Sequence, residues 1–432
     1  MNKLWSKGFE PNKLIEQFTI GNDRVLDLQL AKHDVRGSMA HVRMLQSIGL
    51  LTQDDMEQLL AALQDILKTA ENGVFVIEDG VEDVHSQVEL LLTRQLGEIG
   101  KKIHSGRSRN DQILVDLKLF MREEIEAIAQ LCFILFDRLQ TLSETHKNVL
   151  MPGYTHFQIA MPSSFGLWFG AYAETLVDDL QVLASAYKIA NQNPLGSAAG
   201  YGSSFPLNRR MTTQLLEFET LHFNSIAAQI SRTKATQAMA FGMASIASTL
   251  NHFAADICMF MSQNFGFVRF PDELTTGSSI MPHKKNPDVF ELIRSKCNRL
   301  QNLPNELNLM TTNLPHGYHR DYQLLKDALF PAIEELKNCL IVGEFMLQHI
   351  LVNETILSDS KYDYLFTVEE VNRRVLQDVS FRDAYRQVGE EVAKGTFKAE
   401  KNVVHTHEGS IGNLCNNEIR QKMENVLLTF QN

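Results

Sequence analysis

Five apolar residues repeat at strict seven-residue intervals, and this spacing constrains the fold more than any other feature of the chain. They are Leu114, Met121, Ile128, Leu135 and Leu142. Seven residues make about two turns of an α-helix, so these side chains lie along one face of it. The pattern is typical of the long helices in helical bundles.

A second long segment carries no charge. Between Ala235 and Ala255 there is no Asp, Glu, Lys or Arg, and such a length would suffice to span a bilayer. Gln237, Ser245 and Asn251 make the segment only moderately apolar, and small residues on every face suit a helix packed among other helices. We therefore predict a buried bundle helix, completed by other subunits, and not a transmembrane segment.

Breaks in the helical pattern divide the 432 residues into three predicted units. A small helical unit covers residues 1–106, a unit of long bundle helices covers 107–352, and a smaller, more polar helical unit covers 353–432. We predict an all-α fold.

Shorter elements follow from local signals. Thr52 is placed to cap a helix over 50–68. Further helices are expected at 154–191, 286–309 and 323–351. Strand signals are scarce, and only 74–77 and 403–405 are candidates for very short strands.

Charge and cysteine usage exclude several classes of protein. The net charge of -11, spread along the chain without a basic run, argues against a nucleic-acid or anionic-membrane surface. The five cysteines lie far apart and form no C-x-x-C pair, which favours reduced thiols in the cytoplasm. The start, Met1 to Trp5, is not followed by an apolar stretch, so no secretory signal is expected.

Polar segments at the ends of predicted helices are the candidates for chemistry. Residues 104–111 place Arg107 and Arg109 around Ser108, and two guanidinium groups suit a carboxylate, although Ser108 or Asn110 could simply cap the next helix. Residues 153–158 are expected to form a polar turn before a helix, and the turn holds His156, which could exchange protons near neutral pH or serve structure.

Residues 316–323, with Lys326 beyond them, offer a second anion and hydrogen-bonding clamp or a polar turn between helices. His405 and His407 resemble a metal-binding pair, but no third ligand at a suitable spacing is evident, so we expect no metal.

The loop 277–288 combines a glycine, two serines and two lysines before a helix start that we place at Asn286 and Pro287. A helix N-terminus favours anions, and Lys284 would add to that preference. Glu291, one turn into the helix, could orient a histidine or interact with the helix dipole. A solvated surface loop is the alternative.

Together, these segments resemble the argininosuccinate lyase branch of the fumarase/aspartase superfamily. The sequence GSSIMPHKKNP at 277–287 is similar to the signature loop of that superfamily, and HSGRSRNDQ at 104–112 and MPGYTHFQ at 151–158 resemble the versions found in this branch. The resemblance runs from Trp5 to about Gly389.

The resemblance implies a three-domain subunit whose long helices form the central bundle of a homotetramer, with active sites shared between subunits. It also implies reversible β-elimination of fumarate from a small-molecule substrate, argininosuccinate, to give arginine in the last step of arginine biosynthesis. No metal or organic cofactor is implied.

Residue roles follow from the same resemblance. Ser278 and His156 match the proton-transfer pair, without a decision on which is the base, and Glu291 matches the partner of the histidine. Lys284 and Asn286 match groups that hold a substrate carboxylate and its developing charge. Substrate-binding positions are matched by Arg109, Asn110, Thr155, Tyr318, Gln323 and Lys326.

Some positions depart from the family pattern, mainly where the amine half of the substrate is recognised. Asp23 stands where a serine is usual. A lyase acting on a modified argininosuccinate or another N-substituted aspartate is therefore the alternative. A non-catalytic structural paralogue, like a lens crystallin, is disfavoured because the matched catalytic residues are all present.

Overall fold

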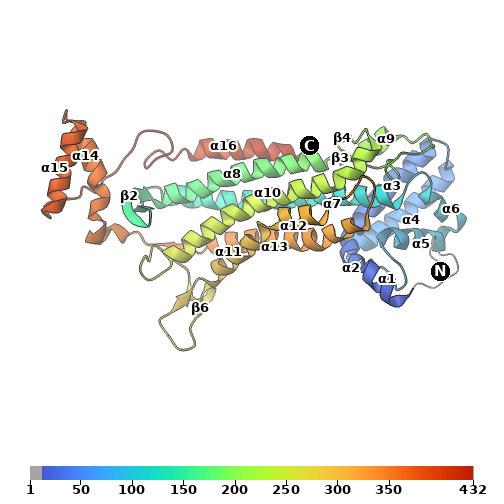
Figure 1. The fold of residues 1–432 in the computed structure, drawn as a ribbon, viewed down its shortest axis with the longest axis horizontal. Coiled ribbons are helices and arrows are strands. Elements are labelled where there is room, and N and C mark those ends of the chain that lie inside the picture. The colour runs from blue at the N-terminus through green and yellow to red at the C-terminus, as the bar shows by residue number, and fades with distance from the viewer. Residues whose placement is uncertain (1–11, 432) are drawn as a thin grey trace.

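The computed structural model describes residues 12–431, and Figure 1 shows an elongated subunit built around long helices. Met1 to Trp5 lie outside the described residues. A cluster of short helices forms one end of the molecule (Figure 1). Its helices are α1 (Lys13–Ile20), α2 (Asp23–Leu26), η1 (Asp27–Leu30), α3 (Ala31–Ser47), α4 (Gln53–Glu71), α5 (Val84–Leu96), α6 (Glu98–Lys101) and η2 (Lys102–His104).

The central bundle confirms the all-α prediction. Its helices are α7 (Arg109–Thr145), α8 (Phe165–Ala190), α10 (Ser225–Phe260), α11 (Asp288–Leu300), α12 (Leu303–Met310) and α13 (Leu324–Leu347). The short helix α9 (Arg209–Leu215) instead packs against α3. The first four residues of the predicted heptad are buried on α7, from Leu114 to Leu135. Met121, Ile128 and Leu135 pack with residues of α8, α10 and α13 in one large hydrophobic core.

The start of α7 is fixed by hydrogen bonds. Ser108 accepts from the Asn110 backbone N–H, and Asp111 accepts from the Ser108 backbone N–H at 2.8 Å, which together form a capping box. The other carboxylate oxygen of Asp111 accepts from the backbone N–H groups of Gly196 and Ala198. The first turn of α7 is thereby joined to the glycine- and serine-rich loop after α8.

The uncharged segment 235–255 lies on α10, which crosses the bundle diagonally beside α8 and α11 (Figure 1). Met243, Ile246 and Ala254 are fully buried, whereas the side chain of Phe241 is 59% exposed. None of the helices within residues 12–431 combines the length and the apolar character needed to cross a bilayer.

A β-hairpin replaces the first part of the helix predicted at 154–191. Strand β1 (Leu150–Thr155) pairs with β2 (Gln158–Ser164), and α8 begins only at Phe165. His156 and Phe157 form the turn, both with positive φ, as a two-residue type I′ turn requires. A turn does lie within the polar segment 153–158, but the strands on both sides of it were not predicted, because the turn contains neither glycine nor asparagine and so carries no hairpin signal.

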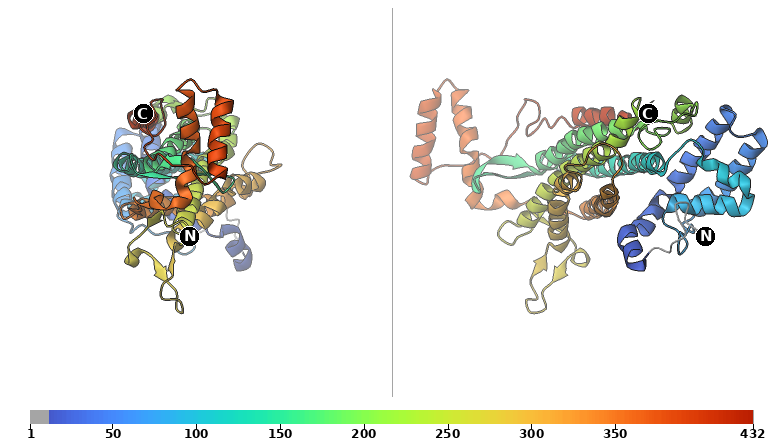
Figure 2. Two further views of the ribbon diagram at one scale, coloured as in Figure 1. Left: turned by 90° about the vertical axis from the view of Figure 1, so that its left-hand side faces the viewer. Right: turned by 45° about the vertical axis from the view of Figure 1, so that its right-hand side comes forward.

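The loop 277–288 also forms a hairpin. Strand β6 (Thr276–Gly277) pairs with β7 (Lys285–Asn286), and the hairpin extends away from the bundle (Figures 1 and 2). The placing of Asn286 and Pro287 as N-cap and first helical residue was wrong, because α11 begins at Asp288 with Pro287 as its N-cap. Asn286 instead pairs across the hairpin with Thr276.

The other strands are two residues long. They are β3 (Gln192–Asn193) with β4 (Thr220–Leu221), in parallel, and β5 (Val268–Arg269) with β8 (Leu351–Val352), antiparallel. Neither predicted short strand, 74–77 or 403–405, forms a strand. The predicted helix over 286–309 is divided near Gln301 into α11 and α12.

The C-terminal residues occupy two places. At the end of the molecule opposite α1 lie η5 (Ile356–Ser358), η6 (Ser360–Phe366), α14 (Thr367–Val375) and α15 (Phe381–Ala393) (Figure 1). The chain then returns, and α16 (Asn416–Leu427) packs along α8 and α7, followed by η7 (Leu428–Gln431). The division at residue 352 stays a prediction.

Gly166, in the first turn of α8, allows a close approach to the end of α7. A Cβ atom there would lie 2.6 Å from both the Lys147 Cα and the Ser143 carbonyl oxygen. Because backbone must move, we expect Gly166→Ala to destabilise the fold by about 1–3 kcal/mol. Thermal unfolding measures this. Gly389→Ala in α15 is the control, because a Cβ atom at Gly389 would meet no atom within 4 Å, and this substitution should be neutral or stabilising. Equal Tm shifts for the two variants would contradict the packing argument.

Candidate active site

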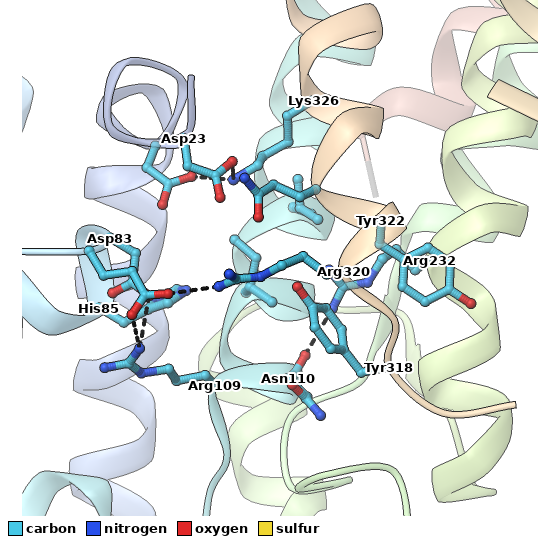
Figure 3. Close-up of a pocket in the computed structure, with 15 residues that line it drawn as sticks. Asp23, Asp83, His85, Arg109, Asn110, Arg232, Tyr318, Arg320, Tyr322 and Lys326 are labelled. Atoms are coloured by element: carbon cyan, nitrogen blue, oxygen red, sulfur yellow. Dashed lines mark hydrogen bonds and ion pairs between the residues drawn. The ribbon is translucent and has the colours of Figure 1, made fainter. Parts of the chain in front are cut away.

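A polar cavity of about 160 Å³ lies where the short N-terminal helices meet α7, α10 and α13 (Figure 3). Five of the predicted substrate-binding residues line it, and several charged residues that the sequence did not single out do so as well. The lining includes Asp23, Asp27, Glu82, Asp83, His85, Arg109, Asn110, Arg232, Tyr318, Arg320, Tyr322, Gln323 and Lys326.

Arg109 is held by the N-terminus of α5. Its guanidinium donates to the Asp83 carboxylate at 3.2 Å and to the Ser86 hydroxyl at 2.8 Å. Asp83 is the N-cap of α5, because it also accepts from the Ser86 backbone N–H. Arg320 reaches the same acidic segment and pairs with Glu82 at 2.8 Å. Both arginines therefore enter the cavity already neutralised.

Arg232 is a buried cation on the other wall, from α10. It donates to the Asn110 carbonyl oxygen at 3.1 Å, and its guanidinium lies over the rings of Tyr318 and Tyr322 at 5.3 and 5.5 Å. These contacts position Asn110 and Tyr318 relative to each other (Figure 3). Such cation–π contacts orient a guanidinium without neutralising its charge.

Lys326 lies between two carboxylates. Its Nζ is 2.8 Å from Asp23 Oδ1 and 2.5 Å from Asp27 Oδ1. Burial alone would lower the pKa of Lys326, but the two carboxylates raise it above its usual value. Gln323, one turn earlier, donates to the carbonyl oxygens of Thr19 and Ile20, so its amide holds the N-terminal helices against α13.

Behind His85 lies a buried network of ionisable groups. His85 Nδ1 is 2.8 Å from Asp34 Oδ1 and 3.5 Å from Asp116 Oδ2, and both aspartates are fully buried. These three residues are the group within residues 12–431 whose ligand atoms lie close enough to hold a metal ion. Burial alone would raise the pKa of Asp34, but His85 and then the buried guanidinium of Arg107 lower it below its usual value, so the network already contains positive charge.

Asp116 makes this network sensitive to pH. Burial, with the neighbouring Asp34 carboxylate, raises the pKa of Asp116 well above 3.8. A folded-state pKa above the unfolded value means that the folded protein binds more protons, so stability falls as pH rises through the interval between the two values.

We therefore expect Asp116→Asn, which cannot ionise, to show a smaller fall in Tm between pH 5 and pH 8 than the unaltered protein. Differential scanning calorimetry measures this fall. Asp137→Asn, which removes an exposed carboxylate of the same helix, is the control. An unchanged Tm difference in Asp116→Asn would mean that Asp116 ionises as freely as an exposed acid.

The other predicted site residues lie outside this cavity. Ser278 and Lys284 are in the loop of the β6–β7 hairpin, where the Ser278 hydroxyl accepts from the backbone N–H groups of Ile280 and Met281. Asn286 donates to the Thr276 hydroxyl at 3.3 Å. Glu291 lies in the first turn of α11 and is exposed.

Thr155 and His156 are at the exposed tip of the β1–β2 hairpin, which follows α7 (Figure 1). Arg109 begins α7, so the cavity and His156 lie at opposite ends of that helix. Within the described part of one chain, no hydrogen bond or ion pair joins His156 to Glu291, and their pairing stays a prediction. One subunit thus presents the predicted residues in three separate groups.

Sequence reasoning missed most of the acidic lining. The segment Glu82-Asp83-Val84-His85 carries a recognisable signal, because an aspartate followed by an apolar helical pattern reads as an N-cap. Nothing local indicated that Glu82, the residue before this cap, would pair with a residue as distant as Arg320.

The chain is similar to known lyases over most of its length. A family model described as Lyase matches residues 10–301. An argininosuccinate lyase of Bacteroides fragilis (strain YCH46) is 61% identical over 428 residues, covering 99% of this chain and 96% of the relative. One from Thermotoga neapolitana is 38% identical, covering 91% of this chain and 98% of the relative.

Solved structures share the fold. An EDDS lyase in complex with formate aligns with a TM-score of 0.74 at 21% identity, covering 98% of this chain and 91% of that one. A class II fumarase from Schistosoma mansoni aligns with a TM-score of 0.71 at 16% identity, covering 95% and 94% of the two chains.

Proposed function

The chain belongs to the argininosuccinate lyase family, and on this premise we propose that it eliminates fumarate from argininosuccinate and releases arginine, the last step of arginine biosynthesis. The observation that carries the proposal is the 61% identity over almost the whole chain, together with the presence of every residue matched to the family's site.

The reaction needs three kinds of group. A base removes a proton from the Cβ carbon of the succinyl part, the C–H electron pair forms the double bond of fumarate, and the C–N bond breaks as the guanidino nitrogen regains a proton. Negative charge builds up on the carboxylate beside Cβ, so cations and N–H donors must surround that group in the transition state.

We assign Lys284 and Asn286 to this carboxylate. Ser278 and His156 are the proton-transfer pair, and Glu291 supports the histidine. A serine base requires stabilisation of its oxyanion by neighbouring N–H groups. The contacts from the Ile280 and Met281 N–H groups to the Ser278 oxygen support such a role.

We assign the cavity to the remaining substrate contacts, from Arg109, Asn110, Tyr318, Gln323 and Lys326, with Thr155 contributing from the β1–β2 hairpin. The reaction in this proposal uses no metal or organic cofactor.

The separation of the three groups within one subunit supports a homotetramer whose active sites are shared. Each site would take the cavity, the β1–β2 hairpin and the β6–β7 hairpin from different copies. Exposed apolar side chains on the bundle helices support this assembly, because apolar surface on a bundle is commonly covered by other subunits. They include Phe241 on α10, Leu292 on α11 and Ile341 on α13, each at least half exposed.

We propose further that residues 1–106, 107–352 and 353–432 act as three domains and that the protein works in the cytoplasm. All five cysteines are free, which supports a reducing compartment.

Fumarate absorbance tests the proposal directly. The purified protein should release fumarate from argininosuccinate in steady-state assays, and a modified argininosuccinate or another N-substituted aspartate serves as the competing substrate. Faster release from a modified substrate would favour the alternative lyase. No fumarate from any of them would favour a non-catalytic paralogue.

A further inference from the structure

Two carboxylates surround Lys326, although one would be enough to neutralise its charge. Asp27, whose side chain is 2% exposed, pairs with Lys326 at 2.5 Å and neutralises it. Asp23 makes a second ion pair with the same Nζ, although its side chain is 19% exposed and lines the cavity. One cation therefore serves two anions, and Asp23 is the anion nearer to the solvent.

Asp23 has capacity for a further partner. Only its Oδ1 atom is paired with Lys326, and within residues 12–431 no hydrogen bond to its Oδ2 atom is found. Burial raises the pKa of Asp23 to about 6, and repulsion from Asp27 and Asp327 adds to this although Lys326 opposes it. Lys326, which Asp23 shares with Asp27, thus offsets the effect of burial only in part.

Arg232, in contrast to Asp23, is a buried cation that lacks a carboxylate partner among the described residues. Among the described residues, no carboxylate lies within ion-pair distance of its guanidinium, which instead contacts a carbonyl oxygen and two tyrosine rings. Its Nε–H is buried without a hydrogen-bond partner. By contrast, Arg109 is paired with Asp83 and Arg320 with Glu82. The cavity thus holds one carboxylate and one guanidinium with unused capacity.

An α-amino acid group, with one ammonium and one carboxylate, matches this pair of charges. In argininosuccinate the succinyl part is bound to the guanidino nitrogen, so the α-amino acid group lies at the other end of the arginine side chain. A volume of about 160 Å³ accommodates such a group rather than the whole substrate. The ammonium would face Asp23 and the carboxylate would face Arg232.

We propose that Asp23 binds the α-ammonium group of the amine half and selects substrates in which this amine is free over those in which it is acylated. This inference rests on the proposed function, because that function identifies the amine half as an α-amino acid. Asp23 is in this sense a specificity-determining residue and takes no part in the proton transfers.

Binding of arginine and of Nα-acetylarginine tests the assignment, measured by titration calorimetry at pH 8, where Asp23 is ionised. The unaltered protein should bind arginine at least about tenfold more tightly, because only arginine presents an ammonium group to the carboxylate. Asp23→Asn should weaken arginine binding by a similar factor and leave Nα-acetylarginine unchanged. In turnover it should raise KM with little change in kcat.

Asp54→Asn is the control, since Asp54 is an exposed acid in the first turn of α4, accepts from Gln58, and does not line the cavity. It should leave both affinities unchanged. Equal binding of the two ligands by the unaltered protein, or tight arginine binding by Asp23→Asn, would overturn the proposal. Fumarate release by the unaltered protein tests the proposed function, whereas the two affinities test the role of Asp23, so the two proposals can fail separately.

Discussion

Replacing Ser278 with alanine is expected to lower kcat by about 10²–10⁴-fold, the usual contribution of a positioned proton-transfer group. The substitution removes one oxygen atom from an exposed loop, so the fold and the assembly should not change. Fumarate absorbance gives kcat, and light scattering gives the assembly state. Ser279→Ala changes the adjacent, exposed serine of the same loop and should retain most of the activity.

A Ser278→Ala protein with undiminished kcat would remove this serine from the chemistry. If instead Ser279→Ala lost as much activity as Ser278→Ala, the loop would matter through its conformation and not through one hydroxyl group. Either result would leave the family assignment in place, because that assignment rests on identity over the full chain.

Two inactive variants are expected to restore activity when they are combined in one assembly. Ser278→Ala and His156→Ala each remove one member of the proton-transfer pair, and both residues lie on hairpins that project from the subunit. If each site takes these two residues from different copies, random hybrids of equal amounts should recover about a quarter of the intact sites, since each residue is intact with a probability of about one half.

Co-expression of the two variants with different affinity tags, followed by purification through both tags, gives the hybrids for assay. The double variant combined with Ser278→Ala is the control, and it should stay inactive because no copy supplies Ser278. Hybrids as inactive as their parents would show that Ser278 and His156 of one active site come from the same chain.

The long helices were predictable from sequence because their signals are local and repeated. The heptad from Leu114 to Leu142 lies on one helix, and Ser108 caps that helix as one of the two candidates named for it. At His156 the polar turn was predicted but the hairpin was not, because positive φ at two residues other than glycine is imposed by strand pairing, and sequence propensity does not reveal it.

The cavity was predictable only in part. Arg109, Asn110 and Lys326 were selected through motifs, and all three line it. The acidic partners of these residues were not predicted. Asp27 and Lys326, for example, are 299 residues apart and meet only through the packing of η1 on the bundle. Long-range pairing of this kind leaves no periodic trace in a sequence.

The length of α7 has a consequence beyond folding. Its 37 residues span about 55 Å at 1.5 Å per residue, with Arg109 at one end and the hairpin that carries His156 just beyond the other. In the proposed tetramer the length of this helix sets the distance between the two parts that each copy adds to active sites, the cavity with Arg109 and the hairpin with His156. Adding one heptad would preserve the buried face of the helix yet displace His156 by about 10 Å. Catalysis, and not stability alone, would then fix the number of turns.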